Sequence, residues 1–185
     1  GLQKFHDANP LRQGARREEL RALLDDMVAR EFFEYGVTFL IEEGKVKGVD
    51  SLLGLSTHTI SLSPEQEGIR GQILPLLQEG GTSPTDLKAL PEVLGQDAKA
   101  VQDVVAAMQG MGDLVRIDDT LLFHLDVVAE VEEKLVAHFE SASEIDVGTF
   151  RDLVGTTRKY AVPMLNYFDT KGTTIRQGDV RVLAK

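Results

Sequence analysis

Apolar residues recur at helical spacing along three consecutive stretches of about sixty residues, and each stretch closes with short polar–apolar alternation. In the first stretch, residues 1–61, the pattern predicts helices at 16–24 and 26–43 and a hairpin that pairs 44–49 with 58–61. The first ten residues are too short for an independent element. We therefore predict that this first unit is truncated.

The second stretch, residues 62–125, opens with the strongest helix-start signal in the chain. Ser63 is expected to cap a helix that begins at Pro64, and Gln66 lies at the third helical position, where its side chain can bond back to the cap. The apolar spacing and the turn residues predict two further helices, at residues 83–90 and 97–111. A hairpin is expected at residues 114–124.

The third stretch, residues 126–185, repeats this order. Its first helix carries an apolar stripe, Asp146 is expected to cap the second, and a third is expected at about 157–170. In the closing hairpin, a two-residue loop at 177–178 is expected to place Arg176 and Arg181 on one face. The residues expected to face the core are Ile175, Val180 and Val182.

Helix, helix, helix and hairpin is the order of elements in a winged helix. Because the order recurs without sequence identity, it indicates a repeat of structure. We predict the α+β class, mainly helical, with tandem winged-helix domains in an elongated array. The three units are a truncated winged helix at 1–61 and complete ones at 62–125 and 126–185, hereafter units 1, 2 and 3.

Charge is distributed unevenly along the chain, whose net charge is -10. Residues 147–185 hold seven Lys and Arg against three Asp and Glu, a net of +4. Subtracting these from the chain's 20 basic and 30 acidic residues leaves 13 and 27, a net of -14 for residues 1–146. A general nucleic-acid coat or membrane-surface protein needs a basic footprint, so we expect a defined polyanion site near the C-terminus.

Several function classes are excluded by what the sequence lacks. With no cysteine and four scattered histidines, disulfides, thiolate metal sites and cysteine nucleophiles are ruled out. We find no nucleophile with a base, no paired acids and no Gly-rich phosphate loop, so we predict no enzyme and no metal site. No apolar run approaches the roughly 18 residues that span a bilayer, and we expect a cytoplasmic protein without a membrane partner.

The start of the last helix is the most informative site for chemistry. Arg158 and Lys159 lie in a first turn, where two cations oppose the helix dipole at a cost of a few tenths to about 1 kcal/mol. A bound phosphate would remove that cost, because free N–H groups and both side chains would then contact it. Solvated surface charge is the alternative. Tyr160 and Tyr167 are either base-stacking residues of an RNA site or core tyrosines.

The sequence of residues 150–163, FRDLVGTTRKYAVP, resembles the C-terminal domain of the bacterial selenocysteine-specific translation elongation factor, the SelB family. Residues 167–169 and 178–183 share this resemblance, and weaker similarity extends upstream at 9–12, 17–20, 62–65 and 121–124. It implies that the chain is the distal part of four winged helices, the last of which binds the selenocysteine insertion hairpin of an mRNA downstream of a UGA codon.

The resemblance also implies partners and site residues. The ribosome is implied as a further partner. GTP, Mg²⁺ and selenocysteinyl-tRNA are expected to bind N-terminal domains of the family that lie outside this chain, so we expect no cofactor here. We also expect a monomer. Family members often have two adjacent arginines before the wing turn, and here Ile175 stands at the first position. The RNA-binding residues we predict are Arg151, Thr157, Arg158, Lys159, Tyr160, Arg176 and Arg181.

Two other classes stay open. A DNA-binding winged-helix regulator would be expected to dimerise on paired half-sites, and the acidity of units 1 and 2 fits poorly with duplex DNA. Tandem winged helices can also act as rigid spacers or as protein-interaction adaptors. For units 1 and 2 we favour this interpretation.

Overall fold

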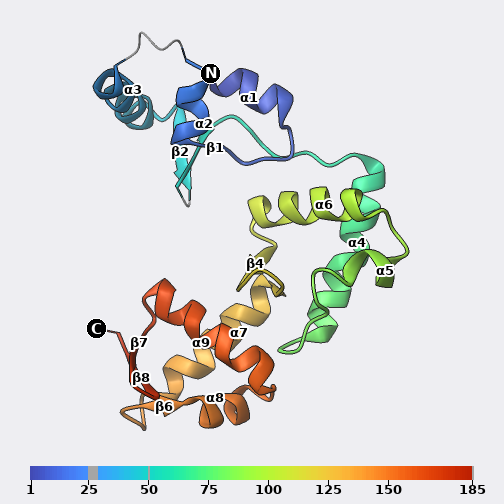
Figure 1. Ribbon diagram of the computed structural model, residues 1–185, viewed down its shortest axis with the longest axis vertical. Helices are drawn as coiled ribbons and strands as arrows, with labels where there is room; N and C mark the ends of the chain where they lie inside the picture. The colour runs from blue at the N-terminus through green and yellow to red at the C-terminus, as the bar shows by residue number, and fades with distance from the viewer. Residues whose placement is uncertain (25–28, 50, 185) are drawn as a thin grey trace.

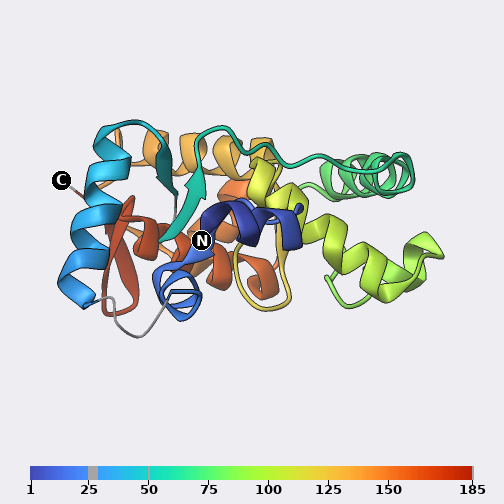
Figure 2. The ribbon, with the colours of Figure 1, turned by 90° about the horizontal axis from the view of Figure 1, so that it is seen from above.

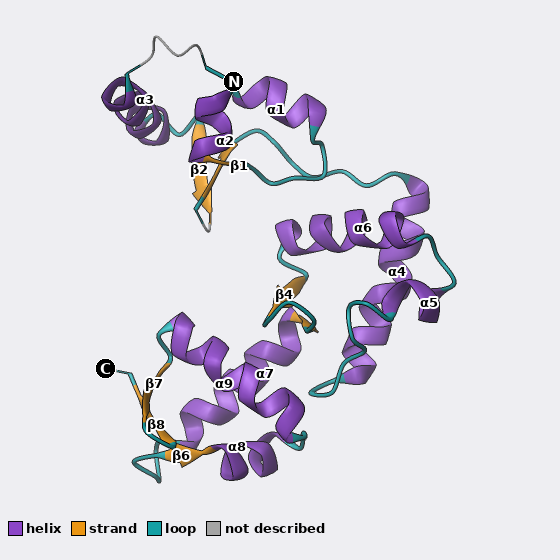
Figure 3. Cartoon of the chain, in the orientation of Figure 1, coloured by secondary structure: helices purple, strands orange, loops and turns teal. Residues whose placement is uncertain are grey.

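The computed structural model describes residues 1–24, 29–49 and 51–184. The chain traces an arc, with unit 1 at the top of Figure 1, unit 2 at the right and unit 3 at the bottom. Seen from above in Figure 2, α4, α5 and α6 of unit 2 project to one side of the other two units. Helices and small antiparallel sheets alternate along the arc, as Figure 3 shows, and the α+β prediction with tandem winged helices is confirmed.

The described residues of unit 1 form three helices and a three-stranded sheet in which β3 lies between β1 and β2. The hydrophobic core of this unit includes Phe5, Leu20, Phe33 and Leu53. Its elements are α1 (Leu2–Ala8), β1 (Ala15–Arg16), α2 (Arg17–Ala22), α3 (Arg30–Glu42), β2 (Val46–Val49) and β3 (Leu52–Leu55).

Two expectations for unit 1 are wrong. The first ten residues do form an element, α1, because Phe5 and His6 are buried against the rest of the unit. The wing pairs β2 with β3 and not with residues 58–61. The successive residues Leu53 and Gly54 of β3 are both buried, so the sequence of this strand shows no polar–apolar alternation. The expected helix start at Asp26 lies outside the described residues.

Unit 2 begins with the capping box that the sequence predicts. The Ser63 side chain accepts from Gln66 N at 3.3 Å, and Ser63 N donates to the Gln66 side chain at 2.9 Å. The elements that follow are α4 (Pro64–Gly80), α5 (Leu90–Leu94), α6 (Ala98–Met111), β4 (Leu114–Arg116) and β5 (Leu122–His124).

The predicted helix at 83–90 is displaced. Helix α5 begins at Leu90, and the residues before it form a loop. Ser83 and Pro84 in this loop make hydrogen bonds with residues of unit 3. The Ser-Pro signal of a helix start is thus overridden by tertiary contacts.

Unit 3 repeats the order of unit 1. Its buried residues include Val131, Leu135, Phe150, Met164 and Phe168, which are the apolar positions that the helical spacing picked out. The elements are α7 (Leu125–His138), β6 (Ile145–Asp146), α8 (Val147–Val154), α9 (Arg158–Lys171), β7 (Thr174–Gln177) and β8 (Val180–Leu183).

The turn in the wing of unit 3 lies one residue later than expected, which shifts the pairing of the two strands by two residues. Gln177 pairs with Val180, so the turn is formed by Gly178 and Asp179, and Gly178 has φ of 65°. Arg176 therefore lies opposite Arg181, which confirms that the two share a face. Ile175, expected to face the core, is 51% exposed, and that expectation is wrong.

Units 2 and 3 share the hairpin β4–β5. Leu114 and Leu122 belong to the core of unit 2, whereas Leu121 and Phe123 belong to the core of unit 3. Successive residues of a strand point to opposite faces, so one short segment contributes to both cores. Helix α7 follows β5 without a linker. The two units are therefore packed as one body.

Candidate nucleic-acid interface

The start of α9 presents two cations without a side-chain cap. Thr157 is the N-cap residue, but its hydroxyl accepts no hydrogen bond from the first turn, and that turn contains no acidic residue. Arg158 and Lys159 are exposed. Within the described part of the chain, the Arg158 guanidinium has no ion-pair partner. This helix start therefore combines free N–H groups with an uncompensated positive charge.

The wing approaches this helix start and forms a pocket of about 340 Å³ with it. Arg158 and Arg176 both line the pocket, and the exposed Arg176 side chain donates from Nε to the Gly178 carbonyl at 3.0 Å. The pocket is lined by Asp146, Val147, Gly148, Arg158, Val162, Arg176, Asp179 and Arg181.

Arg181 lies in this pocket as a buried residue and not as an exposed cation. Its side chain is 3% exposed, and Nε donates to Asp169 Oδ2 at 3.1 Å while a terminal nitrogen donates to Asn166 Oδ1 at 3.0 Å. Asp169 also accepts from the Thr174 hydroxyl at 2.6 Å. These bonds attach both wing strands to α9. They compensate the charge of Arg181, so its main effect is to position the wing.

Two carboxylates limit the positive potential of the pocket. Asp146 caps α8 by accepting from Thr149 N at 2.7 Å, and this backbone hydrogen bond lowers the pKa of the Asp146 carboxyl. Asp146 is therefore ionised at neutral pH, and Asp179 is exposed at the wing turn. An anion that enters the pocket must contact the arginines and avoid both carboxylates, which favours one orientation.

The other predicted site residues lie outside the pocket. Arg151 is paired with the neighbouring Asp152 at 2.7 Å. Lys159 Nζ lies 5.0 Å from the centre of the Tyr160 ring. The Tyr160 hydroxyl donates to the Pro84 carbonyl of unit 2 at 3.3 Å. The structure thus brings together Arg158, Arg176 and Arg181 but not the remaining predicted residues.

Asn166 and Asp169 were not predicted as site residues, although the sequence contained a signal for them. Together with Arg158 and Val162 they lie on the face of the helix opposite the apolar stripe. Polar residues on that face are usually solvated, and only the position of the wing shows that these two hold Arg181.

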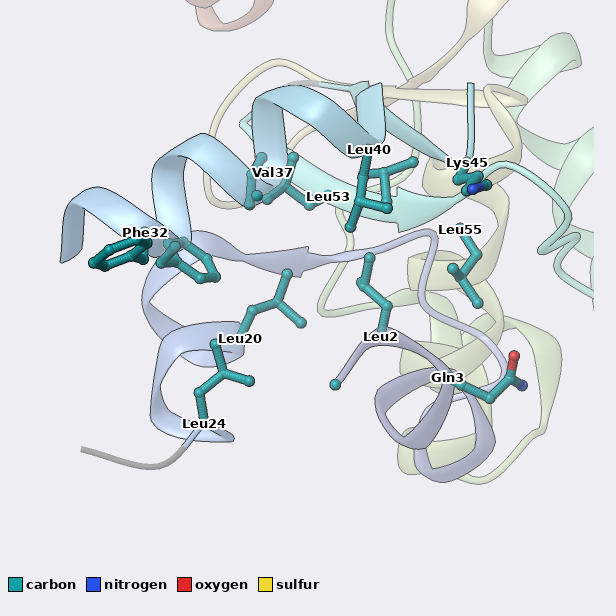
Figure 4. A pocket seen from close by; sticks show the side chains of 14 residues that line it. Leu2, Gln3, Leu20, Leu24, Phe32, Val37, Leu40, Lys45, Leu53 and Leu55 are labelled. Carbon is teal, nitrogen blue, oxygen red and sulfur yellow. The ribbon is translucent and has the colours of Figure 1, made fainter. Parts of the chain in front are cut away.

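Larger pockets lie elsewhere in the described part of the structure. An apolar pocket of about 560 Å³ in unit 1 is lined by side chains such as Leu20, Phe32 and Leu40, with Lys45 as its one charged member (Figure 4). Among the described residues, no three His, Asp or Glu side chains gather closely enough to hold a metal ion. In the same residues, no helix has the length and apolar character of a membrane span.

These features define a tandem winged-helix protein whose last unit carries a cationic pocket between helix and wing. Two family models described as "Elongation factor SelB, winged helix" match, the second-domain model over residues 1–55 and the third-domain model over residues 137–183. The chain belongs to the SelB elongation factor family and corresponds to its C-terminal winged-helix region.

Curated relatives agree with this assignment. The selenocysteine-specific elongation factor of Desulfomicrobium baculatum is 30% identical over 184 residues, and that of Escherichia coli K12 is 25% identical over 182 residues. These alignments cover 100% and 98% of this chain but 29% of each relative. The chain therefore spans about 29% of the length of the curated relatives it matches.

Two solved structures are similar as well. The mRNA-binding domain of elongation factor SelB from E. coli in complex with SECIS RNA has a TM-score of 0.59 and 26% identity, covering 67% of this chain and 100% of that chain. A bacterial selenocysteine-specific elongation factor, EF-Sec, has a TM-score of 0.53 over 94% of this chain and 26% of its own. At 19% identity the second match supports the fold alone.

Proposed function

We propose that unit 3 binds the selenocysteine insertion hairpin of an mRNA and so tethers the longer elongation factor near the UGA codon. The observation that carries the proposal is the pocket in which the uncompensated Arg158 and the exposed Arg176 converge between a helix start and a wing. Support comes from the similarity to a SelB domain in complex with SECIS RNA.

The pocket geometry favours a phosphate group as the first contact. Guanidinium groups bind phosphate through charge-assisted hydrogen bonds, and the free N–H groups of the α9 start add to them. The role is binding and not catalysis, so GTP and Mg²⁺ of the longer protein have no part in it. We also propose that the chain binds as a monomer and that the ribosome is contacted through the assembled factor.

Fluorescence anisotropy with three ligands tests the proposal. The ligands are the hairpin from the cognate mRNA, the same hairpin with its loop or bulge altered, and a DNA duplex of equal charge. We expect one protein per intact hairpin and weaker binding to the altered hairpins and the duplex. Equal binding to all three would contradict a specific RNA site. Preference for the duplex as a dimer would indicate a DNA regulator, and no binding at all would indicate an adaptor.

A further inference from the structure

A loop of unit 2 is bonded to the turn that precedes α9. Thr156 Oγ1 donates to the Thr82 carbonyl at 2.7 Å, and Thr82 Oγ1 donates to the Gly155 carbonyl at 3.3 Å. The hydroxyls of Ser83 and Thr156 are 3.3 Å apart. Because the Thr156 proton goes to Thr82, Ser83 is the donor in that last pair. In Figure 1 this loop runs between α4 and α5 and lies near the junction of α8 and α9.

Tyr160 makes the same connection one turn further along α9. Its hydroxyl donates to the Pro84 carbonyl at 3.3 Å, and its ring meets Phe123 edge to face with centroids 6.5 Å apart. Phe123 comes from β5, the strand that contributes to the cores of both units. Tyr160 is therefore held at both ends by residues 84 and 123, which precede unit 3 in the sequence.

Arg158, which lines the pocket of the proposed RNA site, lies between these two anchors. Arg158 and Lys159 lie between Thr156 and Tyr160, in a first turn that has no side-chain cap and opposes the helix dipole. Such a turn is prone to fraying when no anion is bound. The hydrogen bonds to the loop at residues 82–84 do not involve the N–H groups of this turn, but they fix the residues on either side of it.

We propose that Thr156 and Tyr160 are positioning residues through which unit 2 holds the first turn of α9 in its RNA-binding geometry. This inference rests on the proposed function of unit 3. It assigns Tyr160 a role through its hydroxyl and not through base stacking. It also makes unit 2 a contributor to RNA affinity without a contact to RNA, because a preordered site loses less entropy on binding.

Hydroxyl-deletion variants of the whole chain test this. Tyr160→Phe and Thr156→Val each remove one hydroxyl and keep the shape of the side chain. Each is expected to weaken hairpin binding about threefold to tenfold, which corresponds to the loss of one hydrogen bond. Thr156→Ser keeps the hydroxyl and should restore wild-type affinity. The matched control is Tyr167→Phe, since within the described residues the Tyr167 hydroxyl has no hydrogen-bond partner.

Two further readouts separate positioning from a direct contact. The slope of log Kd against log salt should stay at its wild-type value in Tyr160→Phe and Thr156→Val, because the phosphate contacts are retained. Amide exchange at Tyr160 and Ala161 should accelerate in Thr156→Val, since both N–H groups donate to the Thr157 carbonyl in the affected turn.

The possible results are distinct. Wild-type affinity in Tyr160→Phe together with a loss in Tyr160→Ala would mean that the ring stacks on RNA, and the positioning role would be overturned. Wild-type affinity in both hydroxyl variants would overturn it as well while leaving the proposed function intact. If the wild-type chain bound no hairpin, both proposals would fail.

Discussion

Arg181 is a charged residue of a basic site whose main effect is structural. Its guanidinium is almost fully buried, bonded to Asp169 and Asn166, while Thr174 bonds to the second oxygen of Asp169. The cost of burying this cation is offset only while Asp169 is charged and in place. Like charges directly opposite in a hairpin repel, so the same carboxylate also permits Arg176 to face Arg181.

We expect Asp169→Asn to lower the free energy of unfolding by about 3 kcal/mol, because it leaves the buried Arg181 cation without a counter-charge. Chemical denaturation followed by circular dichroism measures this. Asp152→Asn is the control, since that carboxylate is exposed and pairs with the exposed Arg151, and it should cost less than about 1 kcal/mol. Equal losses in the two variants would show that the Arg181 pair is not buried in solution.

Arg158 differs from Arg181 because it is exposed and has no ion-pair partner among the described residues, so its charge is available to a ligand. Arg158→Ala is expected to weaken hairpin binding by about 1 to 3 kcal/mol and to reduce the salt slope by about 0.7 to 0.9, the loss of one phosphate contact. Arg21→Ala makes the same change at an exposed position of unit 1 and should alter neither value. An unchanged dissociation constant for Arg158→Ala at fixed salt would place the RNA elsewhere.

At the scale of elements, short polar contacts connect segments that differ widely in sequence position. Helix α1 holds residues 56–63, the segment after β3, through two stacked imidazoles. The rings of His6 and His58 have centroids 3.7 Å apart at an angle of 18°, and Leu55 N donates to His6 Nε2 at 3.2 Å. Lys47 Nζ donates to the His58 carbonyl at 3.4 Å. The path of the chain out of unit 1 thus depends on a buried, neutral histidine.

Burial lowers the pKa of His6, and the nearby His58 and Lys47 lower it further. The unfolded chain therefore binds a proton at His6 more readily than the folded protein does. The contribution of neutral His6 to the free energy of unfolding is fully present above the ordinary histidine pKa of about 6.5. It should fall as the pH drops from about 7 through that value toward the lower folded pKa. Thermal unfolding across this range measures the effect. His6→Gln should flatten the pH dependence, whereas His138→Gln at a half-buried position should not. An equally steep profile in His6→Gln would assign the effect to another group.

At the scale of the whole molecule, units 2 and 3 are joined by the hairpin β4–β5 and by the loop at residues 82–84, while unit 1 contacts unit 2 through fewer residues. One of these contacts is at Gly110 of α6, where an added Cβ would lie 2.7 Å from Ile60 Cδ1 and 3.4 Å from Gln13 Cβ. Glycine in a helix lowers its stability relative to alanine, so its presence here is explained by the close approach of unit 1.

Gly110→Val is expected to separate Ile60 and Gln13 from α6 and to loosen unit 1. The radius of gyration from X-ray scattering should increase, and residues 56–63 should be cleaved faster in limited proteolysis. Gly71→Val in α4 is the matched control, because an added Cβ there meets no atom within 4 Å. Hairpin affinity should be unchanged in both variants. If Gly110→Val left scattering and cleavage at control values, the contact between units 1 and 2 would not depend on this glycine.

Much of the architecture could be predicted because its signals are local. Three such signals are the Ser63 capping box, the apolar stripe of α9 and the Asp146 cap. Each involves residues within about two helical turns of one another, so the sequence spacing alone determines how these residues lie relative to each other. The concentration of positive charge in the last forty residues and the position of Arg158 and Lys159 at a helix start follow from equally local patterns.

Contacts between distant residues were decided by the tertiary structure alone. β3 is the central strand of its sheet because β1 and β2 pair with it on either side. Residues 82–84 form a loop instead of the expected helix start, and they are bonded to Thr156 and Tyr160, more than seventy positions away. The burial of Arg181 likewise depends on Asp169 on α9. The sequence by itself therefore determined most of the helices, the family resemblance and the positions of the cations along the chain. Packing determined which of those cations are compensated and which are not, because a charge is neutralised by its neighbours in space.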